Sequence, residues 1–512
     1  MITRRGFIQN SVACASSVLP SSFSQIAKAK EKAGGTITVA IFADPLTFDP
    51  TLALSLQGRA AARAIHDTLF TLDRQGRLAP GLATSWQQTD EKTFIVQLRS
   101  GISFQDGTSF DAAAVKFNID RLRDPALGSI RAGEISTLDS VEIVDTHTIR
   151  MKLKAPFAAF LFPFTDVCGC IGSPTAMQKW GKDYGLHPVG TGPFRLVEYQ
   201  KDSRSVLEKN PNYWDAPKPY LDRIILRPIP TDSTRLGELR AGGVQIAEAL
   251  PLQNIVQLRQ SKDITVAETP GFRFEYFGFN CGDQFAGRSV KFRQAFQWAI
   301  NREALHQVAY FGTGSIGYDL ILPGSPFFDP NYKPFKFDMD KAKRLIDESG
   351  VSVPTTIRAP LIYDPAKQRA AQLFQESASK LGITISIEQV DHAAYATELR
   401  TNKMPIDLQG FWGYRPDPDQ YLTSLCHSTG SYAKFANYRS ASMDALIKEE
   451  QLAHSEDERR RSFRKISDLI NEDSVYVPWH YSSDFKGFNP KVKGFTPRQD
   501  GIIAFQELWL EN

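Results

Sequence analysis

The stretch GFWGYRPDPDQY at positions 410–421 concentrates side chains that could bind a ligand or act on one. Five of them are candidates for contact with a ligand: Trp412, Tyr414, Arg415, Asp417 and Asp419. The two aromatic rings offer apolar surface, and the guanidinium presents a fixed fork of donors that suits a carboxylate or a phosphate. The two aspartates are candidates for a carboxylate pair in acid–base chemistry.

The prolines decide the backbone of this stretch. Pro416 and Pro418 each remove a backbone donor and push the preceding residue out of the helical region, so no helix can pass through and we predict an ordered loop. Aspartates beside prolines more often bond their own backbone in a turn than work as a catalytic pair, which favours turn formation for Asp417 and Asp419. Two hypotheses are open for Arg415. It could anchor an anionic group of a ligand, or it could pair with one of these aspartates and stiffen the loop.

Motifs for catalysis are missing elsewhere in the sequence. The eight histidines form no His-Glu-x-x-His and no i,i+4 pair, and no Gly-x-Ser-x-Gly elbow occurs. The glycines of GTGPF (190–194) lack a following Gly-Lys-Ser/Thr, and Pro193 removes an amide that a phosphate cradle needs. We therefore predict no catalytic residue, no metal site and no cofactor. His480, in VPWHY, is expected to be a packed strand residue.

The cysteines do not indicate a metal site, and they leave open whether a disulfide forms. Four lie beyond the first 29 residues: Cys168, Cys170, Cys281 and Cys426. The Cys-Gly-Cys spacing of the first two lacks the nearby ligands that a metal site needs. Two alternatives stay open for the set: small buried residues, or one long-range disulfide.

The first 29 residues have the pattern of an export signal. TRRGFIQ (3–9) precedes a weakly apolar run that ends in the small-residue pattern Ala27-Lys28-Ala29, so we predict cleavage near Ala29 and a periplasmic location. The paired arginines followed by Gly-Phe-Ile are typical of twin-arginine export; a chance Arg-Arg, or a lipoprotein signal ending at Cys14, are the alternatives. No later run reaches the roughly 18 apolar residues of a membrane span.

Charge excludes a nucleic-acid partner. The chain has 60 basic and 57 acidic residues, and residues 1–29 hold three basic and no acidic ones. The remaining 57 basic residues therefore balance 57 acidic residues, which leaves no electrostatic footprint for DNA or RNA. The 512 residues suffice for two or three domains at roughly 100–200 residues each.

Local patterns predict interleaved strands and helices. GGTITVAI (34–41) alternates as a strand, and Asp111 is placed to cap a helix. Asn301 separates two predicted helices, and Ser455 opens a capping box before another. A helix over 366–382 is followed directly by the strand ITISIEQV, the order of an α/β unit.

Four ordered blocks of the sequence carry a family resemblance. They are LAPGLATSW (78–86), FIVQLRSGISFQDGTSFDAAAVKF (94–117), GTGPFRLVEYQKDSR (190–204) and VKFRQAFQWAINREAL (290–305). Together they resemble the family 5 extracellular solute-binding proteins, the dipeptide-, oligopeptide- and nickel-binding receptors of ABC importers. The likeness runs from about residue 34 to residue 510.

This resemblance implies a two-lobed, periplasmic-binding-protein-like α/β fold with an additional domain, the large cluster-C-like form of type II, and a ligand cleft between the lobes. Residues 1–29 would be the signal peptide. Lobe one would comprise 30–67, 189–270 and 485–512, with 68–188 as its additional domain, and 271–484 would form lobe two. Because the chain crosses between the lobes twice, the lobes could close around a ligand by a hinge.

The resemblance also implies a function: capture of a solute, delivery to the permease subunits of an inner-membrane ABC transporter, and no catalysis, by a monomer. In the dipeptide receptor, a tryptophan that lines the cleft matches Trp412. The aspartate that takes the peptide ammonium falls on Tyr414 or Arg415, and the turn beyond it matches Asp417-Pro418-Asp419. An arginine cannot hold an ammonium, so we expect an anionic peptide-like or opine-like solute. The alternatives are a nickel-chelate or oligosaccharide receptor of the same fold, or an exported hydrolase.

Overall fold

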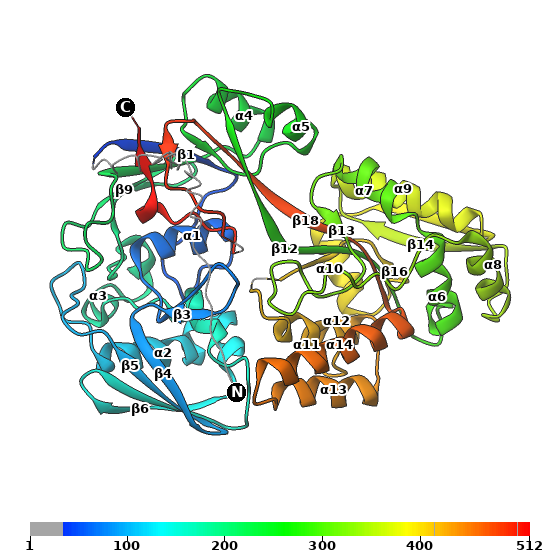
Figure 1. Ribbon diagram of the computed structural model, residues 1–512, viewed down its shortest axis with the longest axis horizontal. Helices are drawn as coiled ribbons and strands as arrows, with labels where there is room; N and C mark the ends of the chain where they lie inside the picture. The colour runs from blue at the N-terminus through cyan, green and yellow to red at the C-terminus, as the bar shows by residue number, and fades with distance from the viewer. Residues whose placement is uncertain (1–33, 414, 499, 512) are drawn as a thin grey trace, which may run out of the picture.

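The structure is a computed structural model that describes residues 34–511 except 414 and 499. The predicted signal peptide therefore lies outside the described residues. Two halves of the molecule are joined by a pair of long antiparallel strands, β12 (Thr265–Phe279) and β18 (Tyr476–Phe488), which run from one half into the other (Figure 1). The pairing of β12 with β18 shifts register between Pro270 and Arg273 and again between Glu275 and Tyr276, so the connection bends within its own length.

The first half is built on the mixed part of the large sheet, in which β1 is parallel to β10 and β11 while β8 and β9 run antiparallel. Its strands are β1 (Thr36–Ile41), β8 (Phe194–Gln200), β9 (Arg204–Lys209), β10 (Arg223–Pro228), β11 (Ile246–Ala247), β19 (Val492–Lys493) and β20 (Trp509–Leu510). Its helices are α1 (Leu56–Ile65), α4 (Asp232–Arg240), α5 (Ile255–Leu258), η6 (Leu252–Asn254) and η8 (Phe505–Glu507). We call this part the first lobe.

A four-stranded antiparallel sheet of order β4-β5-β7-β6 lies below the first lobe in Figure 1, and we call the part built on it the small-sheet unit. Its strands are β2 (Phe70–Leu72), β3 (Leu78–Pro80), β4 (Ala83–Asp90), β5 (Thr93–Leu98), β6 (Leu138–Asp145) and β7 (Thr148–Leu153). Its helices are α2 (Ala112–Arg123), α3 (Pro174–Trp180), η1 (Pro125–Leu127), η2 (Ile130–Ile135), η3 (Phe162–Thr165), η4 (Val167–Gly169) and η5 (Gly181–Leu186). Its own core of buried apolar residues spans Leu69 to Ile171.

The remaining half, the second lobe, combines a parallel strand pair with two groups of helices. Its strands besides β12 and β18 are β13 (Ser315–Ile316), β14 (Thr355–Leu361), β15 (Ile383–Gln389), β16 (Ile406–Asp407) and β17 (Phe411–Trp412). Its helices are η7 (Ala286–Arg288), α6 (Val290–Ala299), α7 (Arg302–Tyr310), α8 (Met339–Asp347), α9 (Pro365–Ser379), α10 (His392–Arg400), α11 (Asp419–Cys426), α12 (Ser431–Phe435), α13 (Ala441–Gln451) and α14 (Glu456–Asp473). Figure 1 places α11 and α13 on the side that faces the small-sheet unit.

Helix starts follow the predicted caps. Asp111 accepts from the Ala114 amide at the start of α2, Asn301 caps α7 and Ser455 caps α14. The helix–strand unit is also confirmed, because α9 is the crossover between the parallel strands β14 and β15. The predicted α/β fold of two lobes with a further unit is thus confirmed, whereas the residue boundaries assigned to the lobes stay a prediction.

Candidate ligand-binding site

The segment that contains the five candidates runs from β17, which pairs with one of the two strands that join the halves, into the first residue of α11. β17 pairs antiparallel with β12, with Trp412 opposite Arg273. Gly410 precedes it with φ of 71°, and a Cβ there would lie 2.5 Å from Oε2 of Glu275, so the backbone at this point needs glycine. Only the backbone of Trp412 is described, and Tyr414 lies outside the described residues; their ligand contacts stay a prediction.

Helix α11 begins at Asp419, directly after Pro418, which agrees with the prediction that no helix passes through the two prolines. Asp417 accepts a hydrogen bond from the Asp419 amide (3.1 Å), so the predicted bonding of an aspartate to its own loop backbone is confirmed. The Asp419 carboxylate accepts from Gln451 Nε2 (2.8 Å) and Thr423 Oγ1 (3.2 Å). Burial raises the pKa of this carboxyl above its ordinary value.

Asp417 is also held by an arginine that its sequence neighbourhood does not reveal. Arg459 of α14 donates from Nη1 to Asp417 Oδ2 (2.6 Å) and from Nη2 to Oδ1 (2.9 Å). The same guanidinium donates from Nε to Glu450 Oε1 (2.7 Å). Burial lowers the pKa of Arg459, but the two carboxylates outweigh it and raise that pKa above its ordinary value. Asp417 therefore works as a support of the loop within the second lobe.

Arg415 turns toward the other side of the molecule. It is 5% exposed, and its Nη2 forms an ion pair with Glu134 of η2, in the small-sheet unit. The two partners expected for a stiffening pair, Asp417 and Asp419, act on it only through space. Burial, followed by repulsion from Arg131 and then Arg59, lowers the pKa of Arg415 to about 9.

A cavity of about 340 Å³ lies where the loop and α11 meet the small-sheet unit. Pro156, Phe157 and Phe162 give it an apolar wall on one side, and Arg415 and Gln420 line the opposite side. This volume is within the range of small-molecule sites, roughly 300–1,000 Å³. The loop predicted from sequence thus borders a cavity between the two halves.

Polar atoms on both walls of this cavity lack a hydrogen-bond partner among the described residues. They are Nε of Arg415, Oε1 of Gln420 and Oγ1 of Thr137, each buried. The large majority of buried side-chain polar atoms in proteins are hydrogen-bonded, so exceptions at three residues around one cavity stand out. One is a charged donor, one an acceptor and one a hydroxyl that can be either.

Sequence reasoning missed the residues that the small-sheet unit contributes. Glu134 and Thr137 come from a short 3-10 helix and the turn after it, in a stretch that has no motif. Gln420 lies inside the stretch 410–421 but was not among the five candidates. Arg459 lies on a helix that was predicted, but nothing in the sequence indicates that its side chain reaches Asp417.

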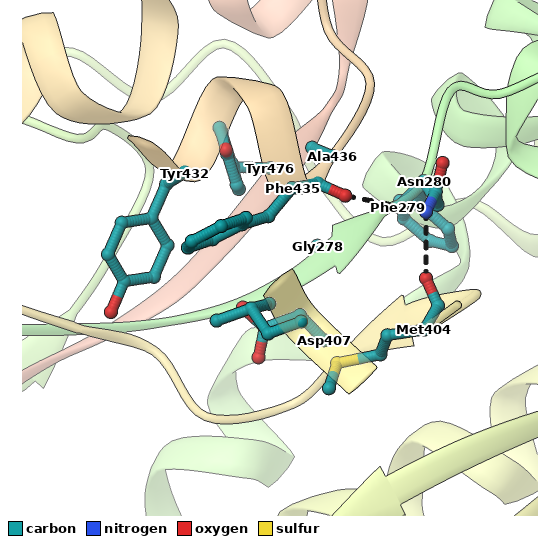
Figure 2. Close-up of a pocket in the computed structure, with 10 residues that line it drawn as sticks. Gly278, Phe279, Asn280, Met404, Asp407, Tyr432, Phe435, Ala436 and Tyr476 are labelled. Atoms are coloured by element: carbon teal, nitrogen blue, oxygen red, sulfur yellow. Dashed lines mark hydrogen bonds between the residues drawn. The ribbon is translucent and has the colours of Figure 1, made fainter. Parts of the chain in front are cut away.

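A second hollow, shown in Figure 2, lies within the second lobe and does not meet the candidate loop. Asn280 donates there to the carbonyl oxygens of Met404 (3.0 Å) and Phe435 (3.4 Å). The space is about 20 Å³, enough for about one water molecule. It is a gap in the packing and not a site for a solute.

Within the described residues, no three or more His, Cys, Asp or Glu side chains are grouped so that they could hold a metal ion. The four cysteines from Cys168 onward are free thiols, and the structure contains no disulfide between them. His480 is fully buried in β18, as expected for a packed strand residue. In the part of the chain that is described, no helix is both long enough and apolar enough to cross a membrane.

Comparison with known proteins decides the family. The profile described as "Bacterial extracellular solute-binding proteins, family 5 Middle" matches residues 77–433. The chain belongs to family 5 of the bacterial extracellular solute-binding proteins. The resemblance carried by the four sequence blocks is therefore confirmed, and with it the assignment to the solute-binding components of ABC importers.

Proteins similar to this one match it over most of its length. The glutathione-binding protein GsiB of Shigella flexneri is 29% identical over 488 residues, which cover 93% of this chain and 94% of that protein. The Helicobacter pylori ABC transporter-associated periplasmic binding protein DppA, in complex with the peptide STSA, has a TM-score of 0.79 and 26% identity, with 94% of this chain and 99% of that chain covered. AgaA of A. tumefaciens R10, in complex with agropinic acid, has a TM-score of 0.77 and 23% identity, with 93% and 99% covered. GsiB and DppA are both named as binding proteins.

Proposed function

We propose that this family 5 protein is exported to the periplasm and captures, as a monomer, an anionic peptide-like or opine-like solute. The solute binds between the second lobe and the small-sheet unit, with Trp412 and Tyr414 as aromatic contacts and Arg415 as the anchor of its anionic group. The protein then passes the solute, chemically unchanged, to the permease of an ABC importer. Asp417 and Asp419 contribute by holding the loop in place through Arg459 and Gln451.

The observation that carries this proposal is that Arg415, Gln420 and Thr137, which line the cavity from its two sides, each hold a buried polar atom with no hydrogen-bond partner among the described residues. Nε of Arg415 is a donor to a carboxylate, Oε1 of Gln420 is an acceptor for an N–H group, and the Thr137 hydroxyl fits either. A molecule with a carboxylate and an amide offers the complementary groups, and leaving them unpaired after closure costs free energy. The apolar wall at Phe157 and Phe162 suits an aliphatic part of the same molecule.

The similar proteins support the peptide-like part of the proposal. GsiB is named for glutathione, a tripeptide with two carboxylates, and DppA holds a peptide. Absence of turnover is supported by the lack of a nucleophile or metal motif in the sequence and by the naming of these proteins for binding. Export is supported by the twin arginines and the cleavage pattern at Ala27–Ala29.

The proposal is tested first by identifying the solute. Protein purified under native conditions is denatured, and released small molecules are identified by mass spectrometry. Protein stripped of ligand is then titrated calorimetrically with glutathione and with glutathione diethyl ester, which lacks both free carboxylates. We expect binding of the acid and at least a hundredfold weaker binding of the ester; equal affinities would contradict an anionic solute. Recovery of the unaltered probe after long incubation tests binding without turnover.

Arg415→Gln tests the anchor. Truncating one partner of a buried charge pair loses roughly 2–5 kcal/mol, about a thirty-fold to several-thousand-fold loss of affinity. Arg464→Gln is the matched control, because that arginine lies on the exposed face of α14 and pairs with Asp329. If both variants bind the probe equally well, Arg415 does not contact the solute.

A further inference from the structure

Glu134 occupies a place between two arginines that belong to opposite sides of the candidate site. Arg131, three residues earlier on η2, donates from Nη1 to Glu134 Oε1 (2.7 Å). Arg415, on the second lobe, forms an ion pair with the other carboxylate oxygen. The side chains of Glu134 and Arg415 are 13% and 6% exposed, so this contact between the halves is largely shielded from water.

The two arginines repel one another across this gap. After burial, the charge of Arg131 is the largest influence that lowers the pKa of Arg415. An anion placed between two guanidinium groups in a poorly solvated place offsets their mutual repulsion. In this structure the anion is the carboxylate of Glu134.

Further contacts join the second lobe to the small-sheet unit on the same side. The Ala158 amide donates to the Gln451 carbonyl (2.9 Å), and Arg77 lies 3.6 Å from Glu456 in an exposed ion pair. The two sides are therefore closed on each other with Glu134 in place. An exposed pair contributes little, and the backbone hydrogen bond of Ala158 carries no charge, so the buried contact of Glu134 with Arg415 is the charged contact here that a solute anion could compete with.

We propose that Glu134 is an internal substitute for the carboxylate of the solute and thereby sets the affinity and specificity of the receptor. The inference rests on the proposed function in one respect, that Arg415 anchors an anionic group. Without solute, Glu134 bridges both arginines and holds the halves together. The carboxylate of an incoming solute replaces Glu134 as the ion-pair partner of Arg415, while Glu134 keeps its ion pair with Arg131 in η2. A neutral solute cannot release Arg415 in this way and is rejected.

The first experiment uses no ligand, so that its outcome is independent of the proposed function. Small-angle X-ray scattering compares the radius of gyration of the stripped wild type with Glu134→Gln and Glu134→Asp. Gln removes the charge, and Asp keeps the charge on a side chain one methylene shorter, which withdraws the carboxylate from Arg415. Both variants are expected to be more expanded than the wild type. The control, Glu142→Gln, removes a carboxylate that pairs with Arg150 and Lys152 in the same unit and should leave the radius unchanged.

The second experiment measures affinity for glutathione by calorimetry. Glu134→Gln and Glu134→Asp should bind it about tenfold more tightly, because the internal competitor is removed from Arg415. Arg415→Gln should also expand the stripped protein, but it should bind glutathione more weakly. Substitutions at the two partners of one ion pair therefore change the affinity for glutathione in opposite directions. Stripped variants as compact as the wild type overturn the proposal. Weaker binding by both Glu134 variants also overturns it, since it would mean that Glu134 holds a cationic group of the solute. If the wild type does not bind glutathione, that probe of the proposed function has failed, and the scattering result still decides the role of Glu134.

Discussion

Arg459→Met should destabilise the second lobe strongly, because Arg459 bridges Asp417 and Glu450 in a place that water hardly reaches. Arg459 is 6% exposed, Asp417 3% and Glu450 1%. Met keeps the length and apolar stem of the side chain but removes every hydrogen bond to the two carboxylates. Breaking a buried ion pair from one side costs roughly 3–5 kcal/mol, since the remaining charge is uncompensated.

The expected fall in melting temperature follows from that free energy. A loss of 1 kcal/mol shifts the midpoint by about 2–4 °C for a domain of 150–250 residues, so Arg459→Met should melt about 6–20 °C lower at pH 8. Circular dichroism or scanning fluorimetry measures this directly. Arg460→Met is the matched control: the neighbouring arginine is on the exposed side of the same helix and pairs with Glu456, so its loss should cost no more than about 1 kcal/mol.

The pH dependence gives this prediction a second check. Burial already raises the pKa of Glu450 well above its ordinary value, and removing Arg459 raises it further. A carboxyl whose folded pKa is raised contributes stability below its unfolded pKa and loses it as the pH rises through the folded value. The gap between Arg459→Met and the wild type should therefore be smaller at pH 5 than at pH 8. If Arg459→Met has the same melting temperature as Arg460→Met at both pH values, the bridging role of Arg459 is refuted.

Three more outcomes are expected. Gly410→Ala should destabilise the protein by about 1–3 kcal/mol and weaken solute binding, because the new Cβ would lie 2.5 Å from Oε2 of Glu275 at a positive φ; a melt and a titration of the same variant check this. His66 is buried with its pKa lowered to about 4, chiefly by burial, so its neutral form contributes stability fully above pH 6.5 and loses it as the pH falls toward 4. Denaturant titrations should show the wild type losing about 2 kcal/mol more than His66→Gln between pH 7 and pH 5, and equal losses would contradict the depressed pKa. Replacing Arg4 and Arg5 by lysine should leave uncleaved precursor in the cytoplasm, seen by fractionation and immunoblotting; normal periplasmic levels would exclude twin-arginine export.

Much of the local structure could be predicted because it depends on neighbours in the sequence. The two prolines were enough to predict that no helix passes through them, and α11 begins directly after Pro418. The predicted caps Asp111, Asn301 and Ser455 each precede a helix. Turn formation by Asp417 is also a short-range effect, since its carboxylate meets an amide two residues away. The family and the two-lobed fold came from the order of four sequence blocks, not from periodicity.

The partners of the charged side chains were decided by tertiary structure alone. The sequence offered Asp417 and Asp419 as counter-ions for Arg415 because they are near in the chain, yet the loop directs that guanidinium to Glu134 in another unit. Asp417 meanwhile belongs to Arg459, which the packing of α14 against α11 brings to it. Ion pairing depends on the distance between charged groups in space. Because the backbone turns at each proline, the side chains of Arg415 and Asp417 point to different partners although they are close in sequence. For this protein, the sequence determined membership of family 5 and a break in helical structure at Pro416 and Pro418, which lies between β17 and α11. Only the fold determined which side chain faces the cavity, because the facing wall comes from a unit that the sequence does not connect to it.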